Sequence, residues 1–221
     1  ISLLVILLLL LIGSACLSLF AIGIVSRISQ KLYRTTKSSG TEIIPNQTGD
    51  VYGIDISHHQ GTIEWPKVKQ WNGNKIQFVY IKATEGATYL DKTYKINFHD
   101  AKKNGLLVGS YHYFRTTSAV EDQFKHFIKH VDKDKQDLIP LIDVEEKKYW
   151  SSSQFHHNFQ QFLDMVENHF GSKPMIYTVN SFYNLNLSGK YKSYHFLIGR
   201  YGVHPPNMRD ASNWTICQFS E

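Results

Sequence analysis

The stretch LIPLIDVEE, residues 138–146, decides the fold and points to a site. Its first five residues are apolar without polar alternation, a pattern typical of a strand buried on both faces of a parallel sheet or barrel. The run ends in two acids, Asp143 and Glu145, which point to the same side because side chains alternate along a strand. Barrels of this kind place their chemistry at the carboxyl ends of their strands, so both carboxylates are candidate catalytic groups.

Two crowded carboxylates have a chemical use. Crowding pushes their pKa values apart, which leaves one acid as a proton donor and the other charged. The alternative is that Asp143 and Glu145 are solvated acids that open a loop, as we expect for the neighbouring Glu146, Lys147 and Lys148. Two acids one residue apart are too short a motif to decide between these interpretations.

The beginning of the chain differs in composition from the rest. Residues 3–25 carry no charge and are dominated by Leu and Ile, and about 20 apolar residues suffice to span a bilayer. We therefore predict an uncleaved transmembrane anchor over residues 1–26, with a long secretory signal as the alternative. Residues 27–50 predict a juxtamembrane linker, and residues 51–221 predict one folded domain.

Composition narrows the function classes. The net charge of +5 comes largely from the basic residues that follow the apolar run. Cys16 and Cys217 are the two cysteines, and their positions exclude a disulfide framework and a cysteine-based metal site. The sequence holds no nucleic-acid motif and no internal repeat. We therefore expect no cofactor and no nucleic-acid partner.

Strand and helix signals alternate through most of the domain and then change. Apolar and aromatic runs predict strands at residues 51–57, 77–83, 106–114, 138–142, 174–178, 195–201 and 214–219. Helical patterns separate the early strands, with expected N-terminal caps at Asp91, Ser118 and Ser151. After residue 178 the helical signal fades to residues 181–187, and the last strands follow a Pro-rich loop. Five βα steps followed by bare strands predict an irregular α/β barrel.

Taken together, these motifs resemble family 25 of the glycoside hydrolases, lysozymes that cut peptidoglycan. The similarity covers residues 51–221 and keeps the family's strand order. The motifs are GIDISHHQG at 53–61, FVYIKATEG at 78–86, GSYHYF at 109–114, PLIDVEE at 140–146 and PMIYT at 174–178. The resemblance implies a TIM-like (β/α)5(β)3 barrel that cleaves the β-1,4 bond between N-acetylmuramic acid and N-acetylglucosamine.

The resemblance also implies a role for each acid. Glu145 matches the general acid and Asp143 its partner, while Asp55 completes an acidic cluster. Glycoside cleavage needs a protonated carboxyl on the leaving oxygen and negative charge near the oxocarbenium-like carbon. Spacing leaves open whether Asp143 attacks, activates water or orients the acetamido group of the substrate. We favour the last role, because similar glycosidases with this motif use the acetamido group.

Substrate-binding candidates surround these acids. Glu85 matches a further acid of the family, for which we expect a binding or electrostatic role, with a structural tie to Lys82 as the alternative. Flat aromatic faces stack on sugar rings, although each such residue is more often part of a core. The aromatic candidates are Tyr111, Tyr113, Tyr177 and Trp214. Among them we favour Tyr113 and Tyr177.

Two other function classes remain open. The histidines His58, His59 and His112 beside Asp55 could hold zinc and support a metal-dependent glycan deacetylase. Adjacent His58 and His59 at a strand end should point apart, however, so we expect no metal site. A catalytically silent glycan-binding module is the other alternative, and the intact acidic motif argues against it.

The end of the chain departs from the family pattern. Cys217 stands where the family has Trp, and the family's final strand, with its further Asp, has no counterpart before Glu221. We therefore expect a truncated domain, an open barrel and unpaired sheet edges. The expected partners are peptidoglycan glycan strands and, through the N-terminal helix, a membrane. We expect a monomer whose domain is secreted or anchored outside the cytoplasm.

Overall fold

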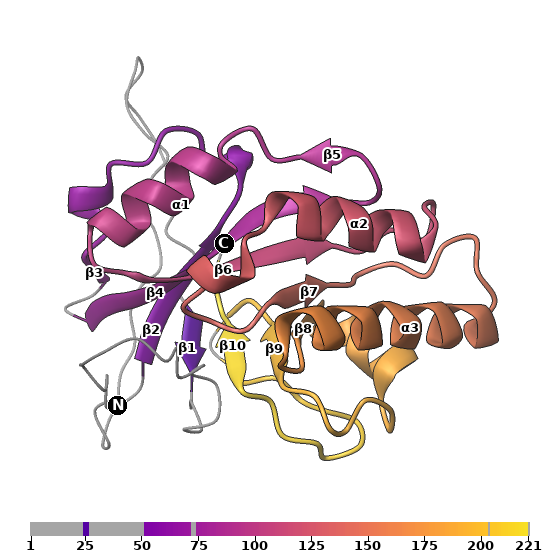
Figure 1. The fold of residues 1–221 in the computed structure, drawn as a ribbon. Helices are drawn as coiled ribbons and strands as arrows, with labels where there is room; N and C mark the ends of the chain where they lie inside the picture. The colour runs from indigo at the N-terminus through magenta and orange to yellow at the C-terminus, as the bar shows by residue number, and fades with distance from the viewer. Residues whose placement is uncertain (1–23, 27–50, 72–73, 203, 221) are drawn as a thin grey trace, which may run out of the picture.

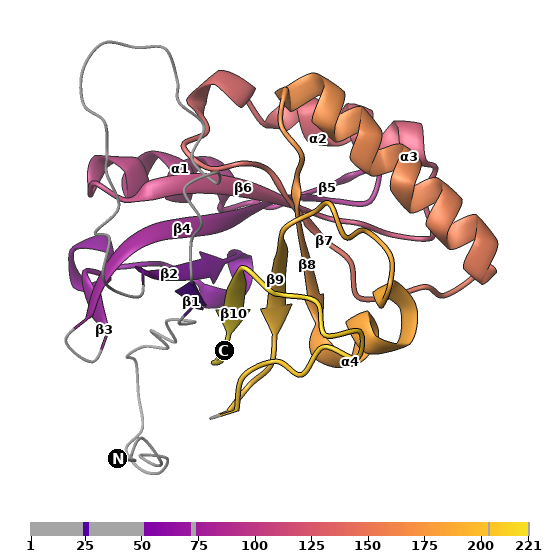
Figure 2. The ribbon, with the colours of Figure 1, turned by 90° about the horizontal axis from the view of Figure 1, so that it is seen from below.

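A curled, mostly parallel sheet organises the protein (Figure 1). The computed structural model describes residues 24–26, 51–71, 74–202 and 204–220. The parallel strands, in sheet order, are β2 (Val51–Ile56), β4 (Asn74–Glu85), β6 (Leu107–Tyr113), β7 (Leu141–Asp143), β8 (Met175–Val179), β9 (Phe196–Gly199) and β10 (Ile216–Gln218). All seven predicted strands are therefore confirmed, with small shifts of their ends. Figure 2 shows the curl, because β8 and β9 run across the direction of β4 and β6.

Three short strands pair antiparallel. β3 (Gln70–Trp71) and β5 (Tyr89–Leu90) form hairpins with β4. β1 (Ile24–Ser26) pairs with β10 on one side and with β2 on the other. The expectation of unpaired edges on these two strands is therefore wrong for the described backbone. Exposed backbone groups at a sheet edge are satisfied by any extended segment, and here an earlier part of the chain supplies it.

The predicted membrane anchor falls mostly outside the described residues. Of residues 1–26, the structure describes Ile24–Ser26, which belong to β1. The predicted linker, residues 27–50, also lies outside the described part. Among the described residues, none of the helices combines the length and the apolar character needed to cross a bilayer.

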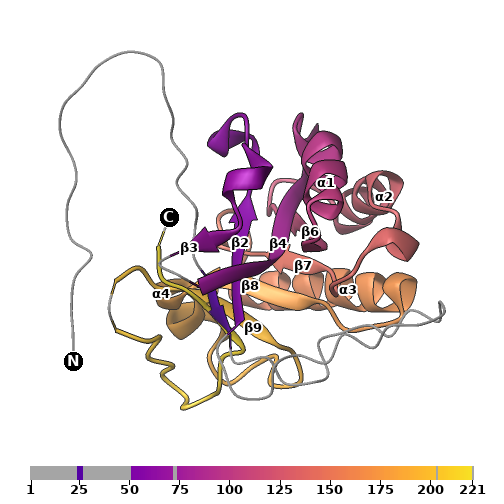
Figure 3. The same ribbon diagram turned by 90° about the vertical axis from the view of Figure 1, so that its left-hand side faces the viewer.

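Three long helices cover the outer face of the sheet. They are α1 (Tyr94–Lys103), α2 (Val120–His130) and α3 (Ser152–Phe170). Figure 3 shows β2, β4 and β6 side by side, with α1 and α2 outside them. Shorter turns of helix are the 3₁₀ segments His58–Gln60, Trp65–Lys67 and Lys133–Lys135, α4 (Asn180–Phe182) and the π-helical turn Tyr183–Leu187.

The predicted helix caps have mixed outcomes. Ser151 forms the expected capping box with Gln154 at the start of α3. The cap predicted at Ser118 is wrong, because α2 begins after Ala119, whose side chain cannot accept a hydrogen bond. Thr93, rather than Asp91, precedes α1. Asp91 instead accepts hydrogen bonds from the backbone of His58 and Thr93, which joins the loop after β2 to the start of α1.

Alternation along the strands separates two cores. Outward side chains such as Val79, Ile142 and Ile176 pack with aromatic residues of the helices. Inward side chains form a second cluster that fills the interior of the curl. Its members are Val51, Phe78, Tyr80, Leu138, Ile139, Leu141, Met175, Tyr177, Leu197 and Ile216.

One glycine makes room for this interior. A Cβ atom on Gly53 would lie 2.4 Å from the ring of Phe78 on the neighbouring strand β4. Such an approach is far below van der Waals contact, so the position admits no side chain. The interior is therefore packed at the amino ends of the strands, which leaves the carboxyl ends for a pocket.

Candidate active site

A pocket of about 240 Å³ opens at the carboxyl ends of the central strands. It is lined by Asp55, Gln60, Tyr111, Leu141, Asp143, Glu145, Tyr177, Leu197, Tyr201 and Gln218. The predicted acidic triad, Asp55, Asp143 and Glu145, thus lies in one cavity. A chain segment of about ninety residues separates the first acid from the other two, and the parallel sheet brings them together.

The end of β7 positions two of the acids. Asp143 is the last residue of the strand, and its carbonyl oxygen accepts a hydrogen bond from the backbone N–H of Phe114 at 2.8 Å. The N–H of Val144 donates to the carbonyl of Tyr177 at 3.0 Å. These bonds to both neighbouring strands keep the backbone extended through Val144. Asp143 and Glu145 therefore face the same cavity, as their spacing predicts.

Asp143 is buried and incompletely satisfied. Its side chain is 7% exposed, and its Oδ1 atom has no hydrogen-bond partner within the described residues. Burial, and then the charge of Glu145, raise the pKa of Asp143 well above its usual range. A buried carboxylate oxygen without a donor is costly, so this atom is suited to accept a hydrogen bond from a bound ligand.

Glu145 has the properties of a proton donor. Burial raises the pKa of Glu145 above its usual range, and the charge of Glu146 acts in the same direction. The hydroxyl of Tyr177 and the cations Lys82 and Arg115 act against this shift. A carboxylic acid with a raised pKa keeps its proton nearer to neutral pH, as a general acid must.

Asp55 lies at the end of a hydrogen-bond chain. The hydroxyl of Tyr177 donates to Oε1 of Gln218 at 2.8 Å, and Nε2 of Gln218 donates to Oδ1 of Asp55 at 3.0 Å. Burial among the strands raises the pKa of Asp55 to about 7, although the Gln218 bond opposes the shift. A Cβ atom on Gly199 would lie 2.7 Å from the Tyr177 hydroxyl, so the absence of a side chain at Gly199 leaves space for the hydrogen bond between Tyr177 and Gln218.

The sequence did not single out every residue of this pocket. Gln60, Tyr201 and Gln218 lie within predicted strands or motifs, but they are not among the predicted site residues. Alternation along β10 could have predicted that Gln218 points inward, because it shares its face with the buried Ile216. Tyr201 follows β9 in an exposed loop, and no local pattern marks it.

Three predicted binding residues are absent from the pocket lining. Glu85 accepts hydrogen bonds from Lys82 Nζ at 2.5 Å and from Arg115 Nη2 at 2.6 Å, so the structural tie to Lys82 is confirmed. The ring of Tyr113 stacks under Arg115, whose Cζ atom lies 4.4 Å from the ring centroid. Trp214 lines a separate surface pocket before β10. Sugar contacts by these three residues stay predictions.

The residue after Glu145 is also not the solvated acid that we expected. The Glu146 side chain is 10% exposed, and its Oε1 atom lies 3.1 Å from Nη1 of Arg115. Lys148 reaches the other oxygen at 3.3 Å. An isolated acid would stay in water, whereas two cations allow this one to be buried.

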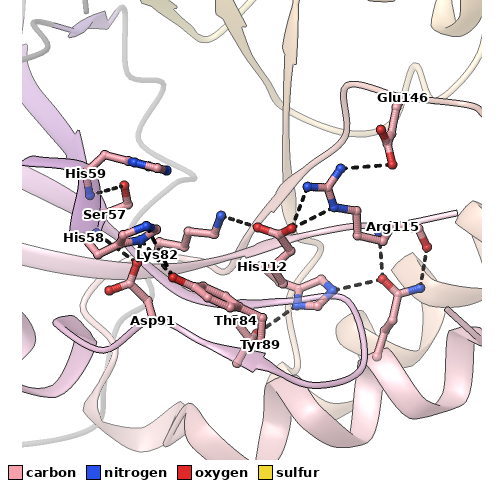
Figure 4. Close-up of polar contacts among 12 residues, drawn as sticks. Ser57, His58, His59, Lys82, Thr84, Tyr89, Asp91, His112, Arg115 and Glu146 are labelled. Atoms are coloured by element: carbon pink, nitrogen blue, oxygen red, sulfur yellow. Dashed lines mark hydrogen bonds and ion pairs between the residues drawn. The ribbon is translucent and has the colours of Figure 1, made fainter. Parts of the chain in front are cut away.

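The three histidines do not converge. His58 and His59 belong to a 3₁₀ helix capped by Ser57, and their rings are 4.0 Å apart, so the expectation that they point apart is wrong (Figure 4). His58 Nδ1 lies 2.8 Å from Asp91 Oδ2. His112 is buried, and burial lowers its pKa to about 3. Within the described ranges, no group of three His, Cys, Asp or Glu side chains could hold a metal ion.

The sequence pattern of the glycosyl hydrolases family 25 matches residues 54–221, which include the whole acidic pocket. The chain belongs to family 25. Membership of this family makes it a glycosidase. The match begins just before Asp55 and runs through β10, so the strand order described above is that of a family 25 domain.

Curated relatives agree with this membership. An uncharacterized protein YegX of Escherichia coli O157:H7 is 36% identical over 86% of this chain and 69% of the relative. An autolytic lysozyme of Clostridium acetobutylicum is 38% identical over 72% of this chain and 48% of the relative.

Solved structures of family 25 proteins share the fold. The family 25 glycosyl hydrolase of Bacillus anthracis has a TM-score of 0.71 at 30% identity, over 83% of this chain and 85% of the other. A family 25 lysozyme of Aspergillus fumigatus has a TM-score of 0.67 at 31% identity, over 76% of this chain and 86% of the other.

Proposed function

We propose that the chain is a peptidoglycan hydrolase, an N-acetylmuramidase that cleaves the β-1,4 bond between N-acetylmuramic acid and N-acetylglucosamine. The observation that carries this proposal is the pocket in which burial raises the pKa values of Asp55, Asp143 and Glu145 in a family 25 domain. Relatives named autolytic lysozyme, lysozyme M1 and N,O-diacetylmuramidase support the substrate class.

In the first step Glu145 is the general acid. Its proton passes to the glycosidic oxygen as the bond from that oxygen to C1 breaks, and the leaving sugar departs with a hydroxyl group. The acetamido carbonyl oxygen of the remaining sugar forms a bond to C1 and gives an oxazolinium ion. Asp143 accepts a hydrogen bond from the acetamido N–H and balances the positive charge.

In the second step water attacks C1 and reopens the oxazolinium ring. The Glu145 carboxylate takes the proton from this water, which restores the acid for the next cycle. Two displacements at C1 return the β configuration, so the proposed route retains stereochemistry. Direct attack by Asp143, or activation of water by it, are the alternatives. The Oδ1 atom of buried Asp143, which has no hydrogen-bond partner among the described residues, favours the acetamido route, because an N–H donor would satisfy it.

Asp55 and Tyr177 complete the proposed site. The pKa of Asp55, raised to about 7, leaves this acid partly protonated near neutral pH, which limits the negative charge around Asp143. Tyr177 lines the pocket beside Leu197, so we retain its predicted contact with a sugar ring. Glu85, through its ion pairs, is better suited to hold the site together than to bind sugar.

The location and full architecture belong to the same proposal. A substrate outside the inner membrane requires the domain to be exported, either anchored through residues 1–26 or secreted. We also propose that the curled sheet represents the (β/α)5(β)3 barrel, and that the protein acts as a monomer. Protease added to intact spheroplasts should digest the domain; complete protection would contradict the predicted location.

The bond specificity can be tested directly on purified peptidoglycan. After digestion, borohydride reduces each new sugar end, so a muramidase yields muramitol and a glucosaminidase yields glucosaminitol. We expect muramitol, undiminished by a chelator, and none from Glu145→Gln. Glucosaminitol would contradict the proposed bond. Release of acetate that stops with chelator would favour a deacetylase, and binding without new sugar ends would favour a silent module.

A further inference from the structure

A network of five charged side chains lies near the acidic pocket, where Lys82, Arg115 and Glu146 act on the charge of Glu145. Figure 4 shows these three members of the network. The network consists of Lys82, Glu85, Arg115, Glu146 and Lys148. Arg115 is its centre, because its guanidinium group bridges two carboxylates that come from different parts of the sheet. Nε and Nη2 donate to Oε1 of Glu85 at 2.8 and 2.6 Å, and Nη1 lies 3.1 Å from Oε1 of Glu146.

Arg115 is itself held at its backbone. Its N–H donates to Oε1 of Gln123 at 2.8 Å, and its carbonyl accepts from Nε2 of the same side chain at 2.9 Å. Gln123 belongs to α2 and is fully buried. The ring of Tyr113 supports the guanidinium group from the other side, 4.4 Å from Cζ. The group is therefore a fixed point rather than a mobile surface charge.

The segment that carries Glu145 has few other ties. Val144 makes the last backbone bond to the sheet, and the next backbone bonds occur within the turn that ends at Trp150. Between these points, in the described structure, the side chain of Glu146 joins the segment to Arg115, and the carbonyl of Lys148 accepts from Thr116 Oγ1 at 3.2 Å. The Glu145 side chain itself has a hydrogen bond with the hydroxyl of Tyr177. Because Glu146 follows Glu145 directly in the chain, the ion pair with Arg115 restrains the backbone next to Glu145.

We propose that Arg115 is a positioning residue, which fixes Glu145 through the ion pair with Glu146 and the anchor on Glu85. The role of Glu145 in this inference rests on the proposed function. A guanidinium group that donates from Nε and Nη2 to Oε1 of Glu85, and from Nη1 toward Glu146, holds a defined planar geometry that a lysine cannot reproduce. A misplacement of about 1 Å can cost about 100-fold in rate, so a remote tie of this kind affects turnover.

The network also acts on Glu145 through charge. Among the described residues, the titratable groups that act on Glu145 are Asp55 on β2, Lys82 on β4, Tyr111 and Tyr113 on β6, Asp143 on β7 and Tyr177 on β8, together with Arg115 and Glu146. Arg115 lowers the pKa of Glu145 and Glu146 raises it. Removing either partner therefore breaks the same tie but moves the pKa of Glu145 in opposite directions.

Four variants and a control test these opposite shifts in the pKa of Glu145. Arg115→Met should lower kcat about 10- to 100-fold, with KM little changed, and move the alkaline limb of the pH–rate profile upward. Glu146→Ala should lower kcat similarly and move that limb downward. Their double variant should lose no more than either alone. Arg115→Lys should recover part of the activity, and Arg209→Met, at an exposed arginine, should behave as wild type.

Hydrogen exchange gives a readout that does not depend on substrate. Exchange in residues 145–150 should be faster in Arg115→Met and Glu146→Ala, while α3 stays protected and the far-ultraviolet spectrum unchanged. Normal kcat in both variants, or pH limbs that move in the same direction, would overturn the positioning role. If Arg115→Met does not fold, Glu146→Ala alone decides. If the wild-type protein cuts no glycan while exchange in residues 145–150 is still faster in the variants, the proposed function is refuted and the restraint by Arg115 stands.

Discussion

Two groups of acids stand at the same edge of the sheet and behave in opposite ways. In the pocket, burial raises the pKa values of Asp55, Asp143 and Glu145. Beside it, Glu85 is also desolvated, which alone would raise its pKa. Hydrogen bonds from Lys82 and Arg115 outweigh this effect and hold the pKa of Glu85 below its usual range. All four residues carry a carboxyl group, so the difference in the direction of their pKa shifts comes from the charged groups around them.

The difference separates reactive acids from structural ones. A carboxylate whose oxygens are both paired with cations keeps its charge and joins strands together. A buried carboxyl group that lacks such partners keeps its proton to higher pH. Glycoside cleavage requires such a protonated group to donate to the leaving oxygen. Variants of the three pocket acids should therefore remove or alter a reacting group, whereas a variant of the paired acid Glu85 should change mainly the stability of the fold and its pH dependence.

The largest effect is expected for Glu145→Gln. The amide keeps the shape of the side chain but cannot donate the proton, so turnover on peptidoglycan should fall by at least about 10²–10⁴-fold. The thermal unfolding midpoint should change little, which serves as the control for folding. Near-normal turnover would move the acid role to another residue, with Asp55, whose pKa is also raised, as the next candidate.

Asp143→Asn should come next, with a loss of about 10²–10³-fold, comparable to that for removing one group that stabilises the transition state. The charge of Glu145 raises the pKa of Asp143, and by reciprocity Asp143 opposes the ionisation of Glu145. Removing the charge of Asp143 should therefore lower the pKa of Glu145. In the activity that remains, the alkaline limb of the pH–rate profile should shift to lower pH. An unshifted limb, measured from pH 4 to 9, would show that the two acids do not interact.

Asp55→Asn tests the pocket through stability. The pKa of Asp55 is raised from 3.8 to about 7 in the folded protein, so ionisation of Asp55 destabilises the fold progressively as pH rises through this window. The amide resembles the protonated acid and can still accept from Gln218. Denaturant titrations should show equal stability near pH 4 and a gain of up to about 4 kcal/mol for the variant at pH 8. A pH-independent difference would contradict the raised pKa.

Glu85→Gln should have the smallest effect and the opposite sign. The pKa of Glu85 is lower in the folded protein than its ordinary value of 4.5. Ionised Glu85 therefore stabilises the fold fully above pH 4.5, and this stabilisation disappears as the pH falls through the lowered pKa of the folded state. The variant should lose about 2 kcal/mol of unfolding free energy at pH 7, because charged hydrogen bonds are removed from Lys82 and Arg115. The deficit should shrink at pH 3. A gain in stability at pH 7 would contradict the paired role.

Local sequence determined much of this protein. The run at 138–146 predicted a buried strand with two acids on one side, and alternation with 3.6-residue periodicity predicted seven strands and the long helices that the structure contains. The capping box at Ser151 was also predicted correctly. These features depend on neighbours within a few residues, where backbone geometry and solvent exposure leave few choices.

Tertiary structure decided the chemistry around those acids. The partner of Asp55 is Gln218, which is 163 residues away, and the partner of Glu146 is Arg115 on another strand end. The pairing of Ile24 in β1 with Gln218 in β10 likewise joins segments that are far apart in the sequence. A pKa depends on burial and on charges within a few ångströms, and these follow from packing rather than from sequence order. The sequence therefore specified which residues carry acid groups, and the folded sheet decided which of them stay unpaired.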